Sequence, residues 1–430
     1  MQNALPSGAE GNKATVEPFR IDVRLHEILM RPEEGAHAGG SAPDNQKLAL
    51  PEPSYPWRAY SEESDPSVTE YQRMNARRAW NAWGKSYFAS RSPKNRKQLR
   101  PLIAYLFTDY KCNLDCHYCW AYNNAVRGLD EDTARRSIDW LHSIGNRVLA
   151  LMGGEPLLRP DFVHKVVNYA ARKGFFVYLP TNGRLMRPDV IDRLGDAGLA
   201  TVNLAIDSIR VKSSLPKALD PIRDNFEYLL RRQRRYGYTV AINTNICRNN
   251  MDDVRALTEL ALERNISIDF HINEAPMIEQ DHFKHYEENA TYIRPQDYEK
   301  VDALLDWIIE RHKGGQRIVN PLSHLREMKN LMRGEVKERC NCRAGRNMLI
   351  IRVDGTLAPC FPMYSASHDW GAVGSPKFDH EQLHEMKKEC TKHCLSTCNY
   401  ILGFCYNTKR VVSWGLKQAL RGFKGVSGSF

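Results

Sequence analysis

Six short apolar runs, separated by helical segments, most constrain the fold of this 430-residue chain. Each run has the length and the β-branched or aromatic content of a buried strand. The runs are LIAYLF from Leu102, VLALM from Val148, FFVYL from Phe175, TVNLAI from Thr201, TVAIN from Thr239 and SIDFHI from Ser267. Strands that alternate with helices predict an α/β fold of parallel βα units, as an open sheet or an incomplete barrel. In either arrangement, chemistry is expected at the carboxyl ends of the strands.

The segments around this repeat differ in composition. Residues 1–98 contain stretches rich in Gly, Pro and polar residues, which predict an N-terminal extension that is partly extended or disordered. Two pieces of it are expected to be structured, EPFRIDVRLHEIL and VTEYQRMNARRAWNAWGKSYF. In the second piece, the spacing of Ala79, Trp80 and Trp83 predicts a helix that packs on the main body. Within the repeat, residues 130–142 begin with acidic capping residues and carry apolar side chains at helical spacing.

The composition limits the compartment and the use of the cysteines. The chain is 42% hydrophobic and 26% charged, as in soluble globular proteins, and has no apolar run of about 18 residues that could cross a membrane. Its first residues lack the pattern of a secretory signal, so we expect a reducing cytoplasm and no disulfides. Eleven cysteines then favour metal or iron–sulfur ligation. Cys247 is isolated and is interpreted as a small buried residue.

The formal charge of +10 raises the question of an anionic partner. The charge is spread along the chain, and a solvated helix face explains its densest cluster, RRQRRYGY at 231–238, so no nucleic-acid partner is expected. Residues 411–430 form a basic amphipathic tail, including Trp414, Leu416 and Phe423. This tail could lie on a membrane surface or cover a core.

Three cysteines follow the first strand in the sequence KCNLDCHYCW, at Cys112, Cys116 and Cys119. A structural zinc site needs a fourth ligand, and His117 would strain the loop because it lies between two of the cysteines. A redox pair of Cys116 and Cys119 leaves Cys112 without a role. A [4Fe-4S] cluster with three protein ligands uses all three thiolates and leaves one iron open.

The motif CNLDCHYC, with Tyr118 before its last cysteine, resembles the cluster-binding loop of the radical S-adenosylmethionine (radical SAM) superfamily. The next strand is followed by GGEP, which is Gly153, Gly154, Glu155 and Pro156. It resembles the glycine-rich segment that receives the methionine amino group of the cofactor in this family. Glycines at a strand end let the backbone approach a ligand closely. The resemblance implies a partial (β/α)6 TIM-like barrel.

Polar residues follow the later strands of this expected barrel. Asn182 follows the third strand, Asp207 and Ser208 follow the fourth, and Asn243 and Asn245 lie at the end of the fifth. Similar enzymes bind the ribose and adenine of S-adenosylmethionine at these places, so the resemblance implies cofactor-binding roles. Each of these residues could instead belong to an ordinary turn or cap.

The sixth strand ends in HINEAP, which places His271 and Glu274 near the expected mouth of the barrel. Both are candidate catalytic residues, as substrate ligands or proton-transfer groups. The alternative for His271 is a structural histidine whose hydrogen bonds are satisfied.

The other cysteines gather near the C-terminus. They are Cys340, Cys342, Cys360, Cys390, Cys394, Cys398 and Cys405. The stretch from 342 to 360 resembles the opening of a SPASM or twitch domain, which attaches auxiliary iron–sulfur clusters to a radical enzyme, whereas the spacing after position 390 departs from the usual SPASM pattern. Seven thiolates allow two clusters with one iron open or held by another ligand, or one cluster with spare cysteines. A zinc ribbon is the alternative structure.

The resemblance implies a radical SAM core barrel at 99–320 and an auxiliary-cluster domain at 321–410. The N-terminal extension at 1–98 and the tail at 411–430 lie outside it. The resemblance also implies that an electron donor, such as flavodoxin or ferredoxin, reduces the first cluster. Reductive cleavage of S-adenosylmethionine then gives a 5′-deoxyadenosyl radical, which abstracts hydrogen from a substrate carbon.

From this resemblance we predict an oxidative modification of a peptide or small-molecule natural product. One alternative is radical C–C bond formation, without net oxidation, on a lipid-like or small-molecule acceptor. No winged-helix pattern for leader binding is evident, which weakens the peptide hypothesis. A zinc-stabilised nucleic-acid-binding protein is the alternative of a different class.

Overall fold

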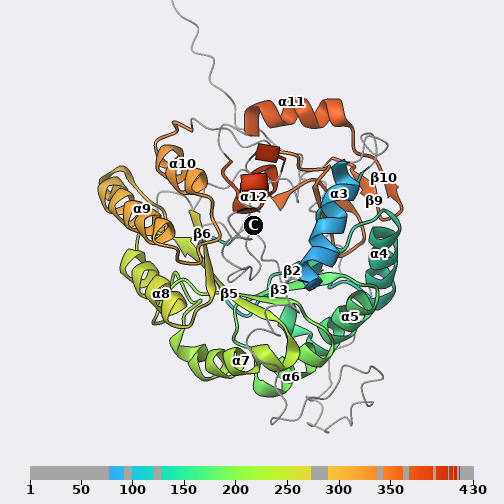
Figure 1. Cartoon of the computed structure of the whole chain (residues 1–430), viewed down its shortest axis with the longest axis horizontal. Helices are drawn as coiled ribbons and strands as arrows, with labels where there is room; N and C mark the ends of the chain where they lie inside the picture. Colours follow the sequence, from blue (N-terminus) through green and yellow to red (C-terminus); the bar gives the residue numbers. More distant parts are fainter. Residues whose placement is uncertain are drawn as a thin grey trace, which may run out of the picture.

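The computed structural model describes residues 77–91, 99–119, 127–272, 289–336, 342–361, 368–390, 394–404, 406–409, 411–413 and 416. All six apolar runs form parallel strands of one curved sheet (Figure 1). The strands are β1 (Ile103–Asp109), β2 (Val148–Gly153), β3 (Phe176–Thr181), β4 (Thr201–Ala205), β5 (Thr239–Ile246) and β6 (Ser267–Ile272). Each pairs with the next in chain order. The predicted α/β fold with a partial (β/α)6 barrel is therefore confirmed.

Helices cover the outer face of this sheet (Figure 1). They are α4 (Glu131–Ser143), α5 (Pro160–Arg172), α6 (Pro188–Asp196), α7 (Arg223–Tyr236), α8 (Met251–Glu263) and α9 (Tyr298–Lys313), with short 3-10 segments at η4 (Pro156–Leu158), η5 (Asp220–Ile222) and η6 (Pro295–Asp297). The predicted acidic cap of α4 is present, because the side chain of Asp130 accepts a hydrogen bond of 2.7 Å from the backbone N–H of Thr133. This bond satisfies one N–H group of the first turn.

The two faces of the barrel strands differ in exposure. On β3 to β6, buried residues alternate with partly exposed ones. The partly exposed positions are Tyr178, Pro180, Asn203, Ala205, Ala241, Asn243, Asp269 and His271. Successive side chains of a strand point to opposite faces, so these residues share the inner face of the barrel, and the buried ones pack under the helices. The inner face therefore remains partly accessible.

The N-terminal segment contributes one helix in the described part, a π-helical turn η2 (Trp80–Gly84) that continues into α3 (Lys85–Arg91). Arg78 fastens its start by donating a hydrogen bond of 2.7 Å to the carbonyl of Gly198, which precedes β4. Trp83 is buried and makes an edge contact with Tyr178 on the inner face. The prediction of a helix packed on the main body is confirmed, but Trp80 is 64% exposed and does not belong to the packed face.

The C-terminal region is continuous with the barrel sheet. Strand β7 (Met348–Ile351) pairs in parallel with β1, and β8 (Leu357–Ala358) pairs antiparallel with β7. The remaining elements are α10 (Leu322–Met332), the short strands β9 (Gly371–Ala372) and β10 (Ser375–Pro376), α11 (His380–Cys390) and α12 (Thr397–Phe404). Figure 1 shows α12 near the middle of the view, and its first residue, Thr397, donates a hydrogen bond of 3.2 Å to the carbonyl of Phe270 in β6.

Two expectations about the chain ends concern residues outside this description. The segment EPFRIDVRLHEIL lies outside the described residues, as do Trp414 and Phe423 of the C-terminal tail. Leu416 is described and is 62% exposed. None of the helices in the described ranges is long and apolar enough to cross a bilayer.

Candidate functional site

The cysteine loop begins where β1 ends, and the GGEP segment lies directly against it. The backbone N–H of Gly154 donates to the carbonyl of Asp109 at 3.0 Å, and that of Glu155 donates to the carbonyl of Lys111 at 2.8 Å. A Cβ atom on Gly154 would lie 2.2 Å from the carbonyl oxygen of Lys111, and one on Gly153 would lie 2.3 Å from that of Asp109. The two glycines therefore permit close contact between the end of β2 and the backbone that leads into Cys112.

The side chain of Glu155 connects two strand ends. It is buried, and its carboxylate accepts hydrogen bonds from the N–H of Leu157 (2.9 Å), the hydroxyl of Thr181 (2.8 Å) and the N–H of Asn182 (2.8 Å). Burial raises the pKa of Glu155, and these hydrogen bonds oppose that rise. The carboxylate thus ties the end of β2 to the end of β3, and Pro156 begins the short turn η4.

Asn182 joins the loop after β3 to the cysteine loop. Its side-chain amide donates a hydrogen bond of 2.8 Å to the side-chain oxygen of Asn113, which follows Cys112. Its own side-chain oxygen accepts from the N–H of Arg184 at 3.0 Å, as in an ordinary Asx turn. In this structure Asn182 therefore positions the cysteine loop.

The three thiols of the cysteine loop lie close enough to influence one another. Cys116 is buried, and Cys112 and Cys119 are partly buried. Burial raises the pKa of Cys112 to about 11, and the charges of Cys119 and Glu155 add to that rise. Burial also raises the pKa of Cys116, together with the charges of Cys119, Asp207 and Cys112, while Lys217 opposes the rise. Ligation requires thiolates, and a nearby positive charge favours the thiolate form.

Lys217 supplies this charge, and the sequence analysis did not single it out. Burial alone would lower its pKa, but the charges of Cys116, Asp207, Cys119 and Cys112 outweigh burial and raise it. Its ammonium group donates a hydrogen bond of 3.1 Å to the hydroxyl of Tyr118 and lies 5.1 Å from the centroid of that ring. A lysine in the long segment between β4 and α7 has no distinguishing spacing, so no sequence pattern pointed to it.

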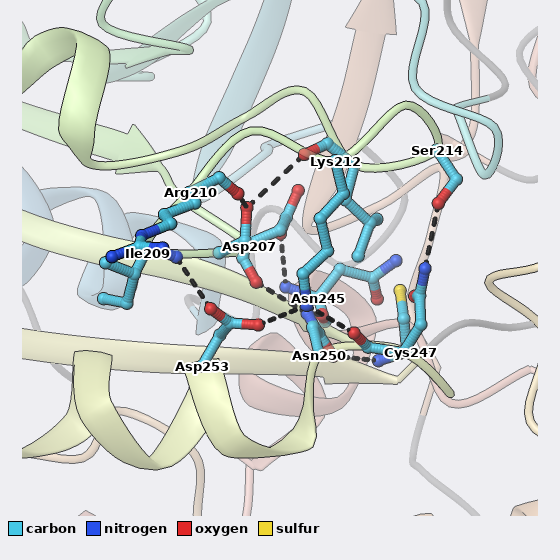
Figure 2. Close-up of polar contacts among 12 residues, drawn as sticks. Asp207, Ile209, Arg210, Lys212, Ser214, Asn245, Cys247, Asn250 and Asp253 are labelled. Atoms are coloured by element: carbon cyan, nitrogen blue, oxygen red, sulfur yellow. Dashed lines mark hydrogen bonds and ion pairs between the residues drawn. The ribbon is translucent and has the colours of Figure 1, made fainter.

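Tyr118 and Asp207 join the cysteine loop to β4. The hydroxyl of Tyr118 donates a short hydrogen bond to the carboxylate of Asp207. The other carboxylate oxygen of Asp207 accepts from the N–H of Asn245 at 2.9 Å, and the side chain of Asn250 bonds the carbonyls of both Asp207 and Asn245 at 2.8 Å (Figure 2). Burial raises the pKa of Asp207, and the charge of Lys217 opposes this rise. The structure thus brings together three predicted site residues, Tyr118, Asp207 and Asn245.

The segment after β4 folds back over the cysteine loop. The carbonyl of Ser214 accepts a hydrogen bond of 3.2 Å from the N–H of His117, and its hydroxyl accepts from the side chain of Asn249 at 2.9 Å. Lys212 and Asp253 form an ion pair of 2.5 Å that holds the same segment (Figure 2). Ser208 bonds the carbonyl of Arg210 at 2.8 Å, so its hydroxyl serves the turn. This polar network fixes the segment that carries Lys217.

Cys247 lies behind the same site. It is fully buried, as the sequence analysis expects, and its N–H donates to the side-chain oxygen of Asn250 at 2.8 Å. Burial raises its pKa, and the charges of Asp207 and Cys116 add to that rise. Cys247 is thus a neighbour of the cysteine loop.

Asn243 and His271 are joined to another carboxylate, Asp269. Both have side chains beside Asp269: the amide of Asn243 donates to its Oδ2 atom at 3.0 Å, and Nε2 of His271 lies 3.5 Å from the same oxygen. Glu274 lies outside the described residues. The two asparagines of β5 therefore have different partners. Asn245 bonds Asp207, which contacts the cysteine loop, whereas Asn243 bonds Asp269 on the inner face of β6.

The C-terminal cysteines are described in part. Cys340 and Cys405 lie outside the described residues, and Cys390 ends α11 with its side chain outside them. Cys360 and Cys394 are buried, while Cys342 and Cys398 are partly buried.

One of these cysteines, Cys398, and the neighbour of another, Phe361, approach the barrel at Tyr105 on β1. The ring of Phe361, beside Cys360, lies 4.6 Å from the ring of Tyr105. Burial raises the pKa of Tyr105, as does Cys398, with which it forms a hydrogen bond. The cysteine-rich region therefore contacts the inner face of the barrel.

The chemistry of the cysteine loop fits a [4Fe-4S] cluster. It offers three thiol donors at one strand end, with a cation, Lys217, beside all three. Within the described ranges, no three His, Cys, Asp or Glu side chains are placed to bind a single metal ion. Cysteines of a cubane bind separate irons, so such convergence is not required of Cys112, Cys116 and Cys119.

Residues 108–269, which include the cysteine loop, GGEP and Asp207, match the family model described as the Radical SAM superfamily. The matched residues therefore carry a radical SAM domain. This match implies a [4Fe-4S] cluster and S-adenosylmethionine as cofactors of the matched region.

Curated relatives match part of the chain. The AdoMet-dependent heme synthase of Methanosarcina barkeri is 30% identical over 211 residues, which cover 47% of this chain and 56% of that protein. The PqqA peptide cyclase of Ruegeria pomeroyi is 29% identical over 163 residues, which cover 36% of this chain and 42% of that protein. The chain thus spans about half the length of the curated relatives it matches.

Solved structures show the same fold. Streptococcus suis SuiB bound to S-adenosylmethionine has a TM-score of 0.54 at 14% identity, covering 72% of this chain and 76% of that one. SuiB bound to its precursor peptide SuiA gives a TM-score of 0.52 at 15% identity, covering 72% and 75%. The likeness extends beyond the matched residues 108–269, because it covers a larger share of the chain.

Proposed function

We propose that this radical SAM enzyme oxidatively modifies a peptide or a small-molecule natural product. The observation that carries the cofactor assignment is the group of three thiols at the end of β1 with Lys217 beside them. When bound, the cluster and S-adenosylmethionine supply a 5′-deoxyadenosyl radical that abstracts hydrogen from a substrate carbon. The chain supplies the ligands, the orientation of the cofactor and a polar inner face for the substrate.

Each group near the cysteine loop has a defined task in this proposal. Cys112, Cys116 and Cys119 hold the cluster. Lys217 compensates the charge of the thiolates and lies where it can pair with the carboxylate of the methionine moiety. Asp207 fixes Lys217 and Tyr118 through the hydrogen bonds described above.

The oxidative outcome rests on the C-terminal cysteines. An oxidation leaves an electron to be removed after hydrogen abstraction, and an auxiliary cluster is a suitable acceptor. The contact of Cys398 with Tyr105 places one candidate cluster ligand at the inner face, where a substrate radical would form. The relatives named for a peptide cyclase and the structure of SuiB with a precursor peptide support a peptide, whereas the heme synthases support a small molecule. A reducing cytoplasm with a flavodoxin or ferredoxin as electron donor completes the proposal.

The test removes the first cluster. The variant Cys112→Ala/Cys116→Ala/Cys119→Ala should lose about four irons per chain and all reductive cleavage of S-adenosylmethionine. Cys247→Ala is the matched control, because it removes a buried thiol near Cys116 that lies outside the motif. Iron analysis and quantification of 5′-deoxyadenosine after anaerobic reduction give the two measurements. Cleavage at the parental rate in the triple variant would refute the assignment.

A further inference from the structure

Two buried oxygen atoms on the inner face of the barrel have no hydrogen-bond partner among the described residues. They are Oδ1 of Asp269 on β6 and Oδ1 of Asn203 on β4. The second carboxylate oxygen of Asp269 is occupied, because Asn243 and His271 both approach it. The Asn203 side chain can present either its oxygen or its amide nitrogen. Two polar groups on this face thus have unused hydrogen-bonding capacity.

The strand register brings these groups to one place. In the sheet, Asn203 is paired with Ala241 on β5, and Asn243 is paired with Asp269 on β6. Ala241 itself is paired with Ser267 on β6, so Asn203 lies directly beside Ala241 and Asp269 lies diagonally from it. The methyl group of Ala241 is the smallest side chain among these four inner positions. A ligand group above Ala241 can reach both polar side chains, since diagonal neighbours across adjacent strands lie within reach of one another.

Aromatic rings belong to the same inner face. The strand register places Tyr105 on β1 and Tyr178 on β3 on this face, and the charge of Asp269 contributes to the raised pKa of Tyr105. The positions Tyr178, Asn203, Ala241 and Asp269 are all partly exposed, in contrast to the buried positions on the helix side of the same strands. A carboxylate that faces aromatic rings suits a positively charged nitrogen, which both attract.

An unpaired carboxylate oxygen is costly unless something binds it. Buried polar atoms in native proteins are nearly always hydrogen-bonded, to protein, water or ligand. Asn243 supports Asp269 only from its Oδ2 side and leaves Oδ1 directed elsewhere. This arrangement holds the carboxylate in place without satisfying it, as a binding residue requires.

We propose that Asp269, with Asn203, binds a positively charged nitrogen group of the substrate, such as an amine or a guanidinium, and this assignment rests on the proposed function. The Oδ1 atom of Asp269 accepts an N–H of the cation, and the amide oxygen of Asn203 accepts a second. The pair determines substrate specificity at a position separate from the cysteine loop.

The experiment compares a cationic and a neutral probe of similar shape, agmatine and N-butylurea. Binding to the full chain, reconstituted anaerobically with S-adenosylmethionine, is measured by saturation-transfer NMR titration. The parent should bind agmatine more tightly than N-butylurea. Asp269→Asn should weaken agmatine by about tenfold or more, the usual effect of a hydrogen bond to a charged group, while N-butylurea changes little. Asp302→Asn, at an ion pair with Arg333 on the outer helices, is the control and should retain the parental preference.

A second variant separates binding from folding. Asn203→Asp adds a carboxylate beside the same position and should tighten agmatine, a gain that a folding defect cannot produce. The proposal would be overturned if the parent bound both probes equally or did not bind agmatine at all. It would also be overturned if Asp269→Asn kept the parental preference. Asp269 would then be a site for ordered water.

The same protein preparation distinguishes this proposal from the one on which it rests. Iron content and cleavage of S-adenosylmethionine are measured on the parent before the titration. A parent that cleaves the cofactor but shows no preference for agmatine refutes the cation site alone. A parent that fails to cleave the cofactor counts against the proposed function.

Discussion

The two cysteine-rich regions of this chain are anchored differently. The cysteine loop after β1 is fastened from several neighbouring strand ends, by Gly154 and Glu155 after β2, Asn182 after β3 and Asp207 after β4. The described part of the C-terminal region joins the barrel sheet at one edge, where β7 pairs with β1, and its later elements reach the barrel through single side chains, such as Thr397 with β6.

This difference shows when the cysteine ligands of a cluster can be predicted from their spacing in the sequence. The cysteine loop takes its geometry from short segments at one edge of a parallel sheet, so its spacing alone identifies it. In the C-terminal region, Phe361 and Cys398 both reach Tyr105 only because the segment after β8 and helix α12 both return to the barrel. The ligand sets there depend on the fold, and the spacing of the cysteines does not determine them.

The prediction with the largest expected effect tests whether the two cysteine-rich regions act separately. Cys394→Ala/Cys398→Ala should retain cleavage of S-adenosylmethionine, because the cysteine loop is untouched, yet lose product formation, because the electron acceptor is removed. The parent should carry about eight to twelve irons, at four per cubane, and the double variant about four fewer. Iron content, 5′-deoxyadenosine and product are measured on the same samples.

A folded double variant is needed for this comparison, since loss of a metal site can unfold the surrounding segment. Circular dichroism and a thermal melt provide the check. If the folded variant lacks the second set of irons but forms product at the parental rate, the C-terminal cluster is structural and takes no part in electron transfer.

The next effect concerns the charge that distinguishes the cysteine loop. Lys217→Met should weaken binding of S-adenosylmethionine by about tenfold to a hundredfold, as expected for loss of a charge-assisted hydrogen bond, while the protein keeps its iron. Lys165→Met is the matched control, because Lys165 forms an exposed ion pair with Glu131 on the outer helices. Equilibrium dialysis with labelled cofactor measures the affinity. Equal affinities for the two variants would show that Lys217 does not contact the cofactor.

The strands and the cysteine loop were predictable because both have local signatures. Apolar runs of strand length, alternating with helices, were enough to predict the barrel, and three cysteines at close spacing were enough to predict the loop. The GGEP segment follows β2, as predicted, but the sequence did not predict that the side chain of Glu155 joins the ends of β2 and β3 by hydrogen bonds. Its neighbours Thr181 and Asn182 follow it by more than twenty residues, so no local pattern reveals these hydrogen bonds.

Other features of the site arise only from the fold. Lys217 lies near the cysteines because the segment after β4 folds back. Asn203 and Asp269 share the inner face of the barrel because β4, β5 and β6 follow one another in the sheet. Trp80 and Trp83 are close in sequence, but only Trp83 faces the barrel, since the segment begins as a π-helical turn and departs from the expected α-helical phase. Helical periodicity could not predict this local change.

The smallest expected effect tests the anchoring of the C-terminal region on α10. His324 is fully buried, stacks on Tyr400 at 4.5 Å, and its Nε2 lies 3.0 Å from the carbonyl of Leu395. Burial lowers its pKa from 6.5 to about 4. Between these values the unfolded chain binds a proton that the folded chain does not, so stability falls as the pH decreases from 6.5 towards 4.

From about pH 7.5 to about pH 5.5, this linkage should reduce the free energy of unfolding of the segment by about 1 kcal/mol. Hydrogen exchange of peptides from α10 and α12 measures the change, with peptides from β1 and β2 as the internal reference. His324→Gln removes the titrating group and should abolish this part of the pH dependence, although it lowers stability at every pH by disturbing the stack on Tyr400. The same pH dependence in parent and variant would mean that His324 is not the group responsible. A loss confined to α10 and α12 would show that the C-terminal region can loosen while the cysteine loop stays in place.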